Sequence, residues 1–160
     1  MTSGPEARAN WWYGDNYSVY GMALTKSEIE GADDEISMYF PEKYRVKNVD
    51  FRRYTIRQDG FFSWFGPYKG ASVLTKALPA KGDMLAVNFA TSSAGSLRVS
   101  LCDENGDVIP GYESNILFGD KVDRPVRFNK PISALAGKAV RVKFDMKDAH
   151  LYSFAFLDNN

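Results

Sequence analysis

Short segments with strand character recur about every ten residues along this sequence, and no long amphipathic helix fits between them. The clearest segment is KAVRVKFDM (138–146), where apolar side chains from Val140 to Met146 alternate with charged ones. Successive side chains of a strand point to opposite faces, so one face packs on a core and the other meets water. SLRVSL (96–101) repeats the pattern. Since two such faces bury each other, we predict an all-β fold, a two-sheet antiparallel β-sandwich of the jelly-roll kind.

The predicted strands are separated by Gly, Pro, Asn and Asp residues, which favour turns. They cover 16–24, 34–40, 50–58, 61–65, 71–78, 83–91, 96–103, 122–129, 138–146 and 151–157. Residues 147–149 are predicted to form a hairpin turn, and 132–137 a short helical turn ended by Gly137.

A domain boundary is predicted near residue 50. Residues 51–160 hold about eight strands, the size of a jelly roll, and are predicted to form the β-sandwich domain. Residues 1–10 are predicted to be a flexible lead. The strands of 11–50 either extend the sheets or are the remnant of a preceding domain.

Charge and composition exclude several functions. Lys and Arg number 20, as do Asp and Glu, so no charge field favours nucleic acid or an anionic membrane as partner. With Cys102 and His150 the only residues of their types, an internal disulfide is impossible and an ordinary zinc site lacks ligands. No apolar run approaches the roughly 20 residues of a membrane span. The N-terminus lacks a secretion signal, so the protein either stays inside the cell or is a piece of a longer secreted or periplasmic one.

The segment DENGD (103–107) resembles the start of a calcium loop, because Asp103, Asn105 and Asp107 place oxygens at alternate positions. Apolar residues resume directly afterwards, where a calcium loop needs more ligands. Asn105-Gly106 also favours a tight hairpin turn. We therefore predict a turn here and no cofactor or metal, although calcium remains an alternative in the loops.

Aromatic residues cluster in WWYGDNYSVY (11–20) and FFSWFGPY (61–68). Flat rings stack on the apolar face of a sugar while planar polar groups bind its hydroxyls. The candidate ligand-binding residues are Trp11, Trp12, Tyr13, Asp15, Arg57, Asp59, Trp64 and Tyr68. Two alternatives stay open: the rings fill the core or cover a sheet face, which is favoured for Phe61 and Phe62, or they dock a neighbouring domain.

Four stretches also carry a resemblance to a known family. They are RRYTIRQDGFFSW (52–64), LTKAL (74–78), LAVNFATSSAGSLRVSLCDENGDVIPGY (85–112) and LAGKAVRVKFDMKDAHLYSFAF (135–156). Together they resemble the C-terminal β-sandwich that follows the five-bladed propeller of bacterial glycoside-hydrolase-like proteins, over about residues 33–157. In that family the catalytic carboxylates lie in the propeller. The resemblance therefore implies an accessory sandwich that contacts carbohydrate or packs against the propeller.

The sequence offers no set of residues that we would assign to a catalytic site. The adjacent carboxylates of 33–35 are expected in a solvated loop, and Asp59 is expected to pair with Arg57 or Arg53. His150 is expected at the surface, and Cys102 half exposed and unreactive. We predict that the chain is not an enzyme but a non-catalytic module that binds glycans weakly. The alternative is a structural domain that packs against a propeller, and a small jelly-roll hydrolase or lyase is the third reading.

Overall fold

The structure is a computed structural model that describes residues 17–44 and 48–158. The described chain consists of strands, turns and one short 3₁₀ helix, and its sheets are antiparallel, so the predicted all-β antiparallel fold is confirmed. Two compact units divide between Gln58 and Asp59, whereas the sequence analysis placed the boundary near residue 50. The division falls later because the strand 50–57 pairs along its whole length with 35–42.

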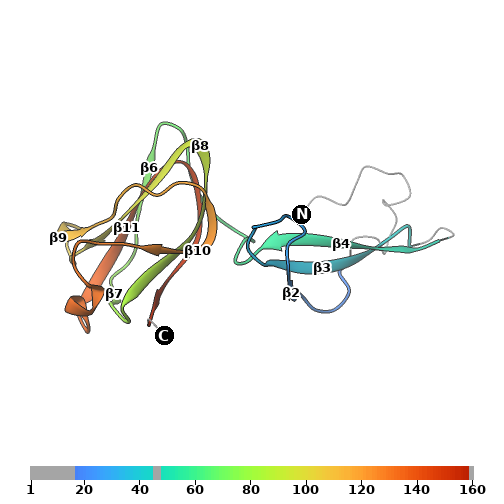
Figure 1. The fold of residues 1–160 in the computed structure, drawn as a ribbon, viewed down its shortest axis with the longest axis horizontal. Helices are drawn as coiled ribbons and strands as arrows, with labels where there is room; N and C mark the ends of the chain where they lie inside the picture. The colour runs from blue at the N-terminus through green and yellow to red at the C-terminus, as the bar shows by residue number, and fades with distance from the viewer. Residues whose placement is uncertain (1–16, 45–47, 159–160) are drawn as a thin grey trace. The chain divides into compact units, whose positions relative to one another are not determined.

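The first unit contains a three-stranded sheet in the order β2-β3-β4 (Figure 1). Its strands are β2 (Ala23–Thr25), β3 (Glu35–Glu42) and β4 (Asp50–Arg57). The β3–β4 register runs from Glu35 opposite Arg57 to Glu42 opposite Asp50. In the described part of the predicted strand 16–24, only Ala23 and Leu24 belong to a strand.

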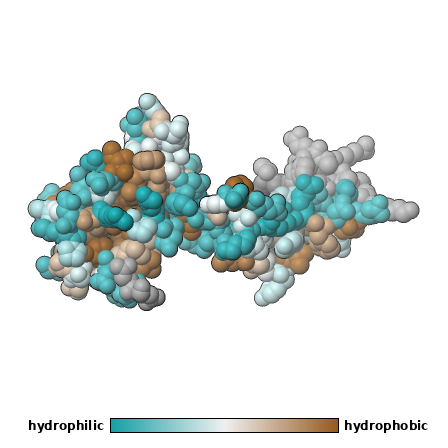
Figure 2. Space-filling model, in the orientation of Figure 1, coloured by the Kyte–Doolittle hydropathy of each residue, from teal (hydrophilic) through white to brown (hydrophobic). Residues whose placement is uncertain are grey.

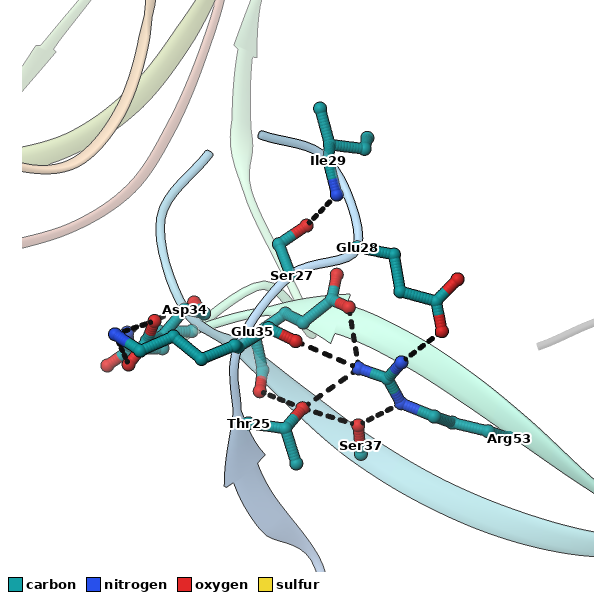
Figure 3. Close-up of polar contacts among 10 residues, drawn as sticks. Thr25, Ser27, Glu28, Ile29, Asp34, Glu35, Ser37 and Arg53 are labelled. Carbon is teal, nitrogen blue, oxygen red and sulfur yellow. Dashed lines mark hydrogen bonds and ion pairs between the residues drawn. The ribbon is translucent and has the colours of Figure 1, made fainter. Parts of the chain in front are cut away.

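Arg53 of β4 holds the strands of this unit together through a polar network (Figure 3). Its guanidinium donates to Glu28 Oε1 (2.7 Å), Ser37 Oγ (2.7 Å), Glu35 Oε1 (2.9 Å), Thr25 Oγ1 (3.0 Å) and Lys26 O (3.2 Å). Its side chain is only 24% exposed. A planar fork of five N–H donors can satisfy acceptors from several directions, so one residue links β2, β3 and the loop between them.

The second unit is a seven-stranded sheet, in which β10-β8-β11-β5 form the main order. Outside this main order, β9 pairs with β8, and β6 and β7 pair with β11. The elements are β5 (Trp64–Gly66), β6 (Ala71–Leu74), β7 (Leu78–Pro79), β8 (Met84–Cys102), β9 (Val108–Glu113), β10 (Asp120–Val126), the 3₁₀ helix η2 (Ile132–Leu135) and β11 (Ala139–Leu157). The helical turn predicted at 132–137 is confirmed, with Gly137 following it at φ +76°.

Two 19-residue strands, β8 and β11, replace four of the predicted ones and run side by side through the unit (Figure 1). The predicted hairpin turn at 147–149 is wrong, because β11 continues through it. Asp148 instead takes φ +44° at a register shift between Lys147 and Ala149. The partner moves from Ser96 to Thr91 across the same shift, so β8 contributes the extra residues of an irregular bulge.

Close approach of the two backbones at this bulge requires a glycine. A Cβ on Gly95 would collide with the carbonyl oxygen of Asp148. The shift also changes which side chains face inward: Phe144 and Met146 are buried before it, and Ala149 and Leu151 after it. The bulge therefore exchanges the side chains that face the core with those that face outward, while the strand continues.

Both halves of β8 and β11 contribute to one core. The fully buried side chains of β8 include Leu85, Val87, Phe89, Leu97, Val99 and Leu101. The β11 side chains Val140, Val142 and Phe144 join the same cluster. The sandwich character of this unit thus comes from one sheet that bends over its own core, as the curvature in Figure 1 shows. The jelly-roll topology remains a prediction.

Candidate functional site

Four of the predicted ligand-binding residues, Trp11, Trp12, Tyr13 and Asp15, lie outside the described residues. Arg57 ends β4 in the first unit. The other three, Asp59, Trp64 and Tyr68, belong to the second unit. The candidate site is built from this second group, since their surroundings are described.

A groove of about 440 Å³ opens beside β5, β6 and the second half of β11. Its lining residues are Trp64, Val73, Leu74, Thr75, Phe144, Leu151, Tyr152, Ser153 and Phe154. Trp64 lies directly opposite Leu151 in the β5–β11 register, so the two side chains share a face. Leu151 and Phe144 are core residues, whereas Trp64 is 64% exposed. The groove therefore runs from the core edge to an exposed indole.

Local sequence explains how β5 comes to lie there. A Cβ on Gly66 would be 2.5 Å from Met146 Cβ, so only glycine lets β5 lie this close to β11. The chain then turns at once, because Gly70 has φ +91° and its N–H donates to Pro67 O at 2.8 Å. This turn delivers β6 to the first half of β11 while β5 pairs with the second half.

One polar pair borders the groove. Ser153 Oγ donates a 2.7 Å hydrogen bond to Asp59 Oδ2. Thr75 is already engaged, since its Oγ1 accepts from Val142 N and donates to Lys76 O. Asp59 has φ +55°, a conformation that Asp tolerates better than most residues. Ser153 lines the groove and Asp59 bonds to it, so this pair can give direction to a polar ligand beside Trp64.

Asp59 does not pair as expected. The predicted partners of Asp59 were Arg57 and Arg53, but its hydrogen bond goes to Ser153, and Arg53 pairs with Glu28 and Glu35. The prediction failed because Ser153 lies 94 positions away in the sequence and reaches Asp59 only through the fold.

Several aromatic residues close in sequence to Trp64 are exposed. Phe62 is 88% exposed and Phe61 is exposed as well, so neither ring fills the core, and the other half of the prediction, that they cover a sheet face, stays a prediction. Tyr68 is exposed, and Lys147 Nζ lies 4.3 Å from its ring centroid, a cation–π contact. Figure 2 shows that apolar residues interrupt the hydrophilic surface.

His150 carries a second, smaller constellation. Its ring lies 4.7 Å from Phe65 and 6.0 Å from Tyr152, measured between centroids. Ser63 Oγ and His150 Nδ1 are 2.9 Å apart in a hydrogen bond. A serine beside a histidine is two thirds of a nucleophilic triad, but no described carboxylate is hydrogen-bonded to this histidine. The arrangement orients the imidazole between aromatic rings.

The segment 103–107 forms the predicted turn. Asp103 Oδ1 accepts hydrogen bonds from Asn105 N (2.9 Å) and Asp107 N (3.0 Å), and Gly106 has φ +95°. This carboxylate therefore caps its own loop, as in an Asx turn. In the described ranges, no three His, Cys, Asp or Glu side chains gather where they could hold a metal ion.

Cys102 differs from its prediction, because it is fully buried rather than half exposed. Both faces of β8 are covered here: Leu101 points into the core, and Cys102 lies opposite Arg141 of β11. Arg141 donates to Thr75 O and Glu104 O, so its side chain stays on this part of the sheet. Burial raises the pKa of the Cys102 thiol, and nearby Lys143 only partly offsets this.

The carboxylates of 33–35 are engaged in ion pairs and hydrogen bonds. Asp34 pairs with Lys26 at 3.0 Å, and Glu35 pairs with Arg53 at 2.9 Å. Glu35 belongs to β3, in agreement with the strand predicted at 34–40 and not with the loop predicted for the carboxylates of 33–35, because its register opposite Arg57 starts the β3–β4 ladder.

No family model, curated protein or solved structure matches the chain. The resemblance to the propeller-associated β-sandwich therefore stays a prediction from its motifs. Among the helices of the described residues, none is long and apolar enough to cross a membrane.

Proposed function

We propose that the second unit is a non-catalytic carbohydrate-associated module that binds a sugar ring weakly in the groove beside Trp64. The observation that carries the proposal is the pairing of one exposed indole with one polar hydrogen-bonded pair at the same groove. A sugar offers an apolar ring face to an indole and hydroxyls to a carboxylate, so the two halves of the site match the two halves of the ligand.

The size and lining of the groove support a small ligand. Its volume of about 440 Å³ lies in the range of small-molecule sites, roughly 300–1,000 Å³. Asp59 and Ser153 already bond each other, so a sugar hydroxyl would add to this pair or replace the Ser153 donor. Few directional contacts and an open groove favour weak binding.

The test is a glycan microarray with and without calcium, followed by calorimetry on each hit. Trp64→Ala should remove binding, while Trp64→Tyr should retain part of it because a ring remains. Phe62→Ala is the matched control, since this exposed ring does not line the groove. Equal affinity of wild type and Trp64→Ala would contradict the site.

Exposed phenylalanines support a second candidate, a structural domain that packs against a glycoside-hydrolase propeller. Phe61, Phe62 and Phe65 are exposed, and large exposed apolar side chains close in sequence are typical of contact surfaces. A blank array from well-folded protein would favour this candidate. So would a complex with a co-expressed propeller domain that is lost in Phe62→Asp.

A further inference from the structure

A second groove, of about 380 Å³, carries two arginines. It is lined by Asn115, Ile116, Leu117, Arg124, Pro125 and Arg127. In the part of the chain that the structure describes, neither guanidinium forms a hydrogen bond or salt bridge, although other cations of this unit are paired. Arg98, for example, contacts Glu113 at 3.1 Å.

The backbone around this groove is firmly held. Leu117 exchanges backbone hydrogen bonds of 2.8 and 2.9 Å with Leu97, in the second half of β8. Arg124 lies opposite Val87, in the first half of the same strand. Both sides of the groove, the 115–117 segment and β10, are thus held by the same strand, β8. Gly119 closes the loop, since its N–H donates to Thr91 Oγ1 and its carbonyl accepts from Thr91 N.

We propose that this second groove binds the carboxylate of an acidic saccharide. A guanidinium matches a carboxylate with two parallel N–H donors, and the guanidinium groups of Arg124 and Arg127 supply that recognition on one groove. Ile116, Leu117 and Pro125 provide an apolar surface for a ring, and the Asn115 amide can bind hydroxyls.

The alternatives fit the groove less well. A nucleic acid needs a longer basic track and rings for base stacking, and this lining contains two cations and no aromatic residue. β10 is an edge strand, where charged residues and Pro125 also prevent pairing with another chain. That role can explain Arg124, which lies in β10, but not Arg127, which lies beyond the strand and lines the same groove.

That the bound carboxylate belongs to a saccharide rests on the proposed function. That the two arginines bind an oxyanion does not. Calorimetry with a galacturonic acid trisaccharide is therefore compared with the neutral galactose trisaccharide and with sodium sulfate. We expect the acidic sugar to bind at least about tenfold more tightly than the neutral one, with affinity that falls as salt rises.

Variants locate the site. The double variant Arg124→Gln/Arg127→Gln should lose this preference for the acidic sugar. Arg124→Lys keeps the charge but loses the planar fork, so it should lower affinity for the carboxylate. Lys69→Gln is the control for the single variant Arg124→Gln, because it removes one positive charge, as that variant does, but from an exposed position outside the groove.

Several results would overturn the inference. One is that the wild type shows no preference for the acidic sugar. Another is that Lys69→Gln loses this preference as much as the arginine variants do. A third is that only Trp64→Ala loses it, which would instead support the groove beside Trp64. Sulfate binding as tight as that of the trisaccharide would overturn the saccharide assignment. Loss of acidic-sugar preference in the arginine variants, with Trp64→Ala unaffected, would support this groove even if the site at Trp64 failed.

Discussion

Ser153 and Asp59 are 94 positions apart in the sequence and are joined by a 2.7 Å hydrogen bond from Oγ to Oδ2. The contact fixes the start of the second unit to the second half of β11. Trp64 follows Asp59 closely in the sequence and lines the same groove as Ser153. The hydrogen bond therefore positions the only polar side chains that we assign to the proposed sugar site.

Substitutions at Asp59 separate its backbone role from its hydrogen bond. At φ +55°, Asp59→Ala should lower the free energy of unfolding by about 1–2 kcal/mol, since alanine disfavours this conformation and accepts no hydrogen bond. Asp59→Asn keeps an acceptor and tolerates the conformation, so it should cost less. Urea unfolding measures both, and Ser153→Ala isolates the hydrogen bond. Equal stability of the Ala and Asn variants would contradict this account.

Core and surface phenylalanines should differ sharply in their effect on stability. Phe144 is fully buried between β-strand neighbours, so Phe144→Ala should destabilise the protein by about 3–5 kcal/mol. Phe62→Ala should change stability by no more than about 0.5 kcal/mol, because that ring is exposed. Urea titrations followed by circular dichroism provide the comparison. A large loss in Phe62→Ala would show that this ring is covered in solution.

The Cys102 thiol should be unreactive in the folded protein. Iodoacetamide at about pH 8 should modify it only after urea unfolding, because burial both blocks access and raises its pKa. A raised folded-state pKa means that the folded chain keeps a proton which the unfolded chain releases. Stability should thus be constant below the ordinary thiol pKa and fall as pH rises through and above it.

The control for this pH dependence is Cys102→Ala, which removes the titrating group. Its unfolding free energy should fall less steeply with alkaline pH than that of the wild type. Rapid alkylation of the native protein would contradict the buried position of Cys102.

Arg53 should be the most sensitive polar residue of the first unit. Arg53→Ala leaves Glu35 without its cation, and the loss of a partly buried hydrogen-bonded pair should lower stability by about 2–4 kcal/mol. Arg53→Lys should recover only part of this, since an ammonium cannot reach five acceptors in different directions. Hydrogen exchange of the amides in β2, β3 and β4 measures the effect.

The matched control for Arg53 is Lys43→Ala. Lys43 pairs with Asp50 at 2.6 Å in an exposed setting, where an ion pair contributes less than about 1 kcal/mol. Similar exchange rates in Lys43→Ala and Arg53→Ala would contradict the role given to the network.

Much of the local structure could be predicted because its causes are local. Alternation in 138–146 predicted which side chains of β11 enter the core, and Val140, Val142 and Phe144 are all fully buried. The turn at 103–107 follows from Asp103 and Gly106, which act within the loop itself. These residues need only their immediate neighbours to adopt the structure found.

The candidate site could be predicted only in part. Trp64 and Asp59 were predicted as ligand-binding residues from the chemistry of sugar recognition, but Ser153 lay inside an ordinary strand pattern and gave no signal. The burial of Cys102 was also missed, since alternation assumes that one face of a strand is open to water. Arg124 and Arg127 carried no motif, and their shared groove appears only once β10 and the 115–117 segment are placed.

The sequence by itself determined the all-β class, the inward face of 138–146, the turn at 103–107 and the balance of charge, because period-two alternation and turn chemistry act over a few residues. Only the tertiary structure decided that 84–102 and 139–157 are continuous strands, that Trp64 lies opposite Leu151, and that Ser153 meets Asp59. The physical reason is that register between distant strands depends on bulges and on packing around a shared core. A single strand's pattern specifies neither.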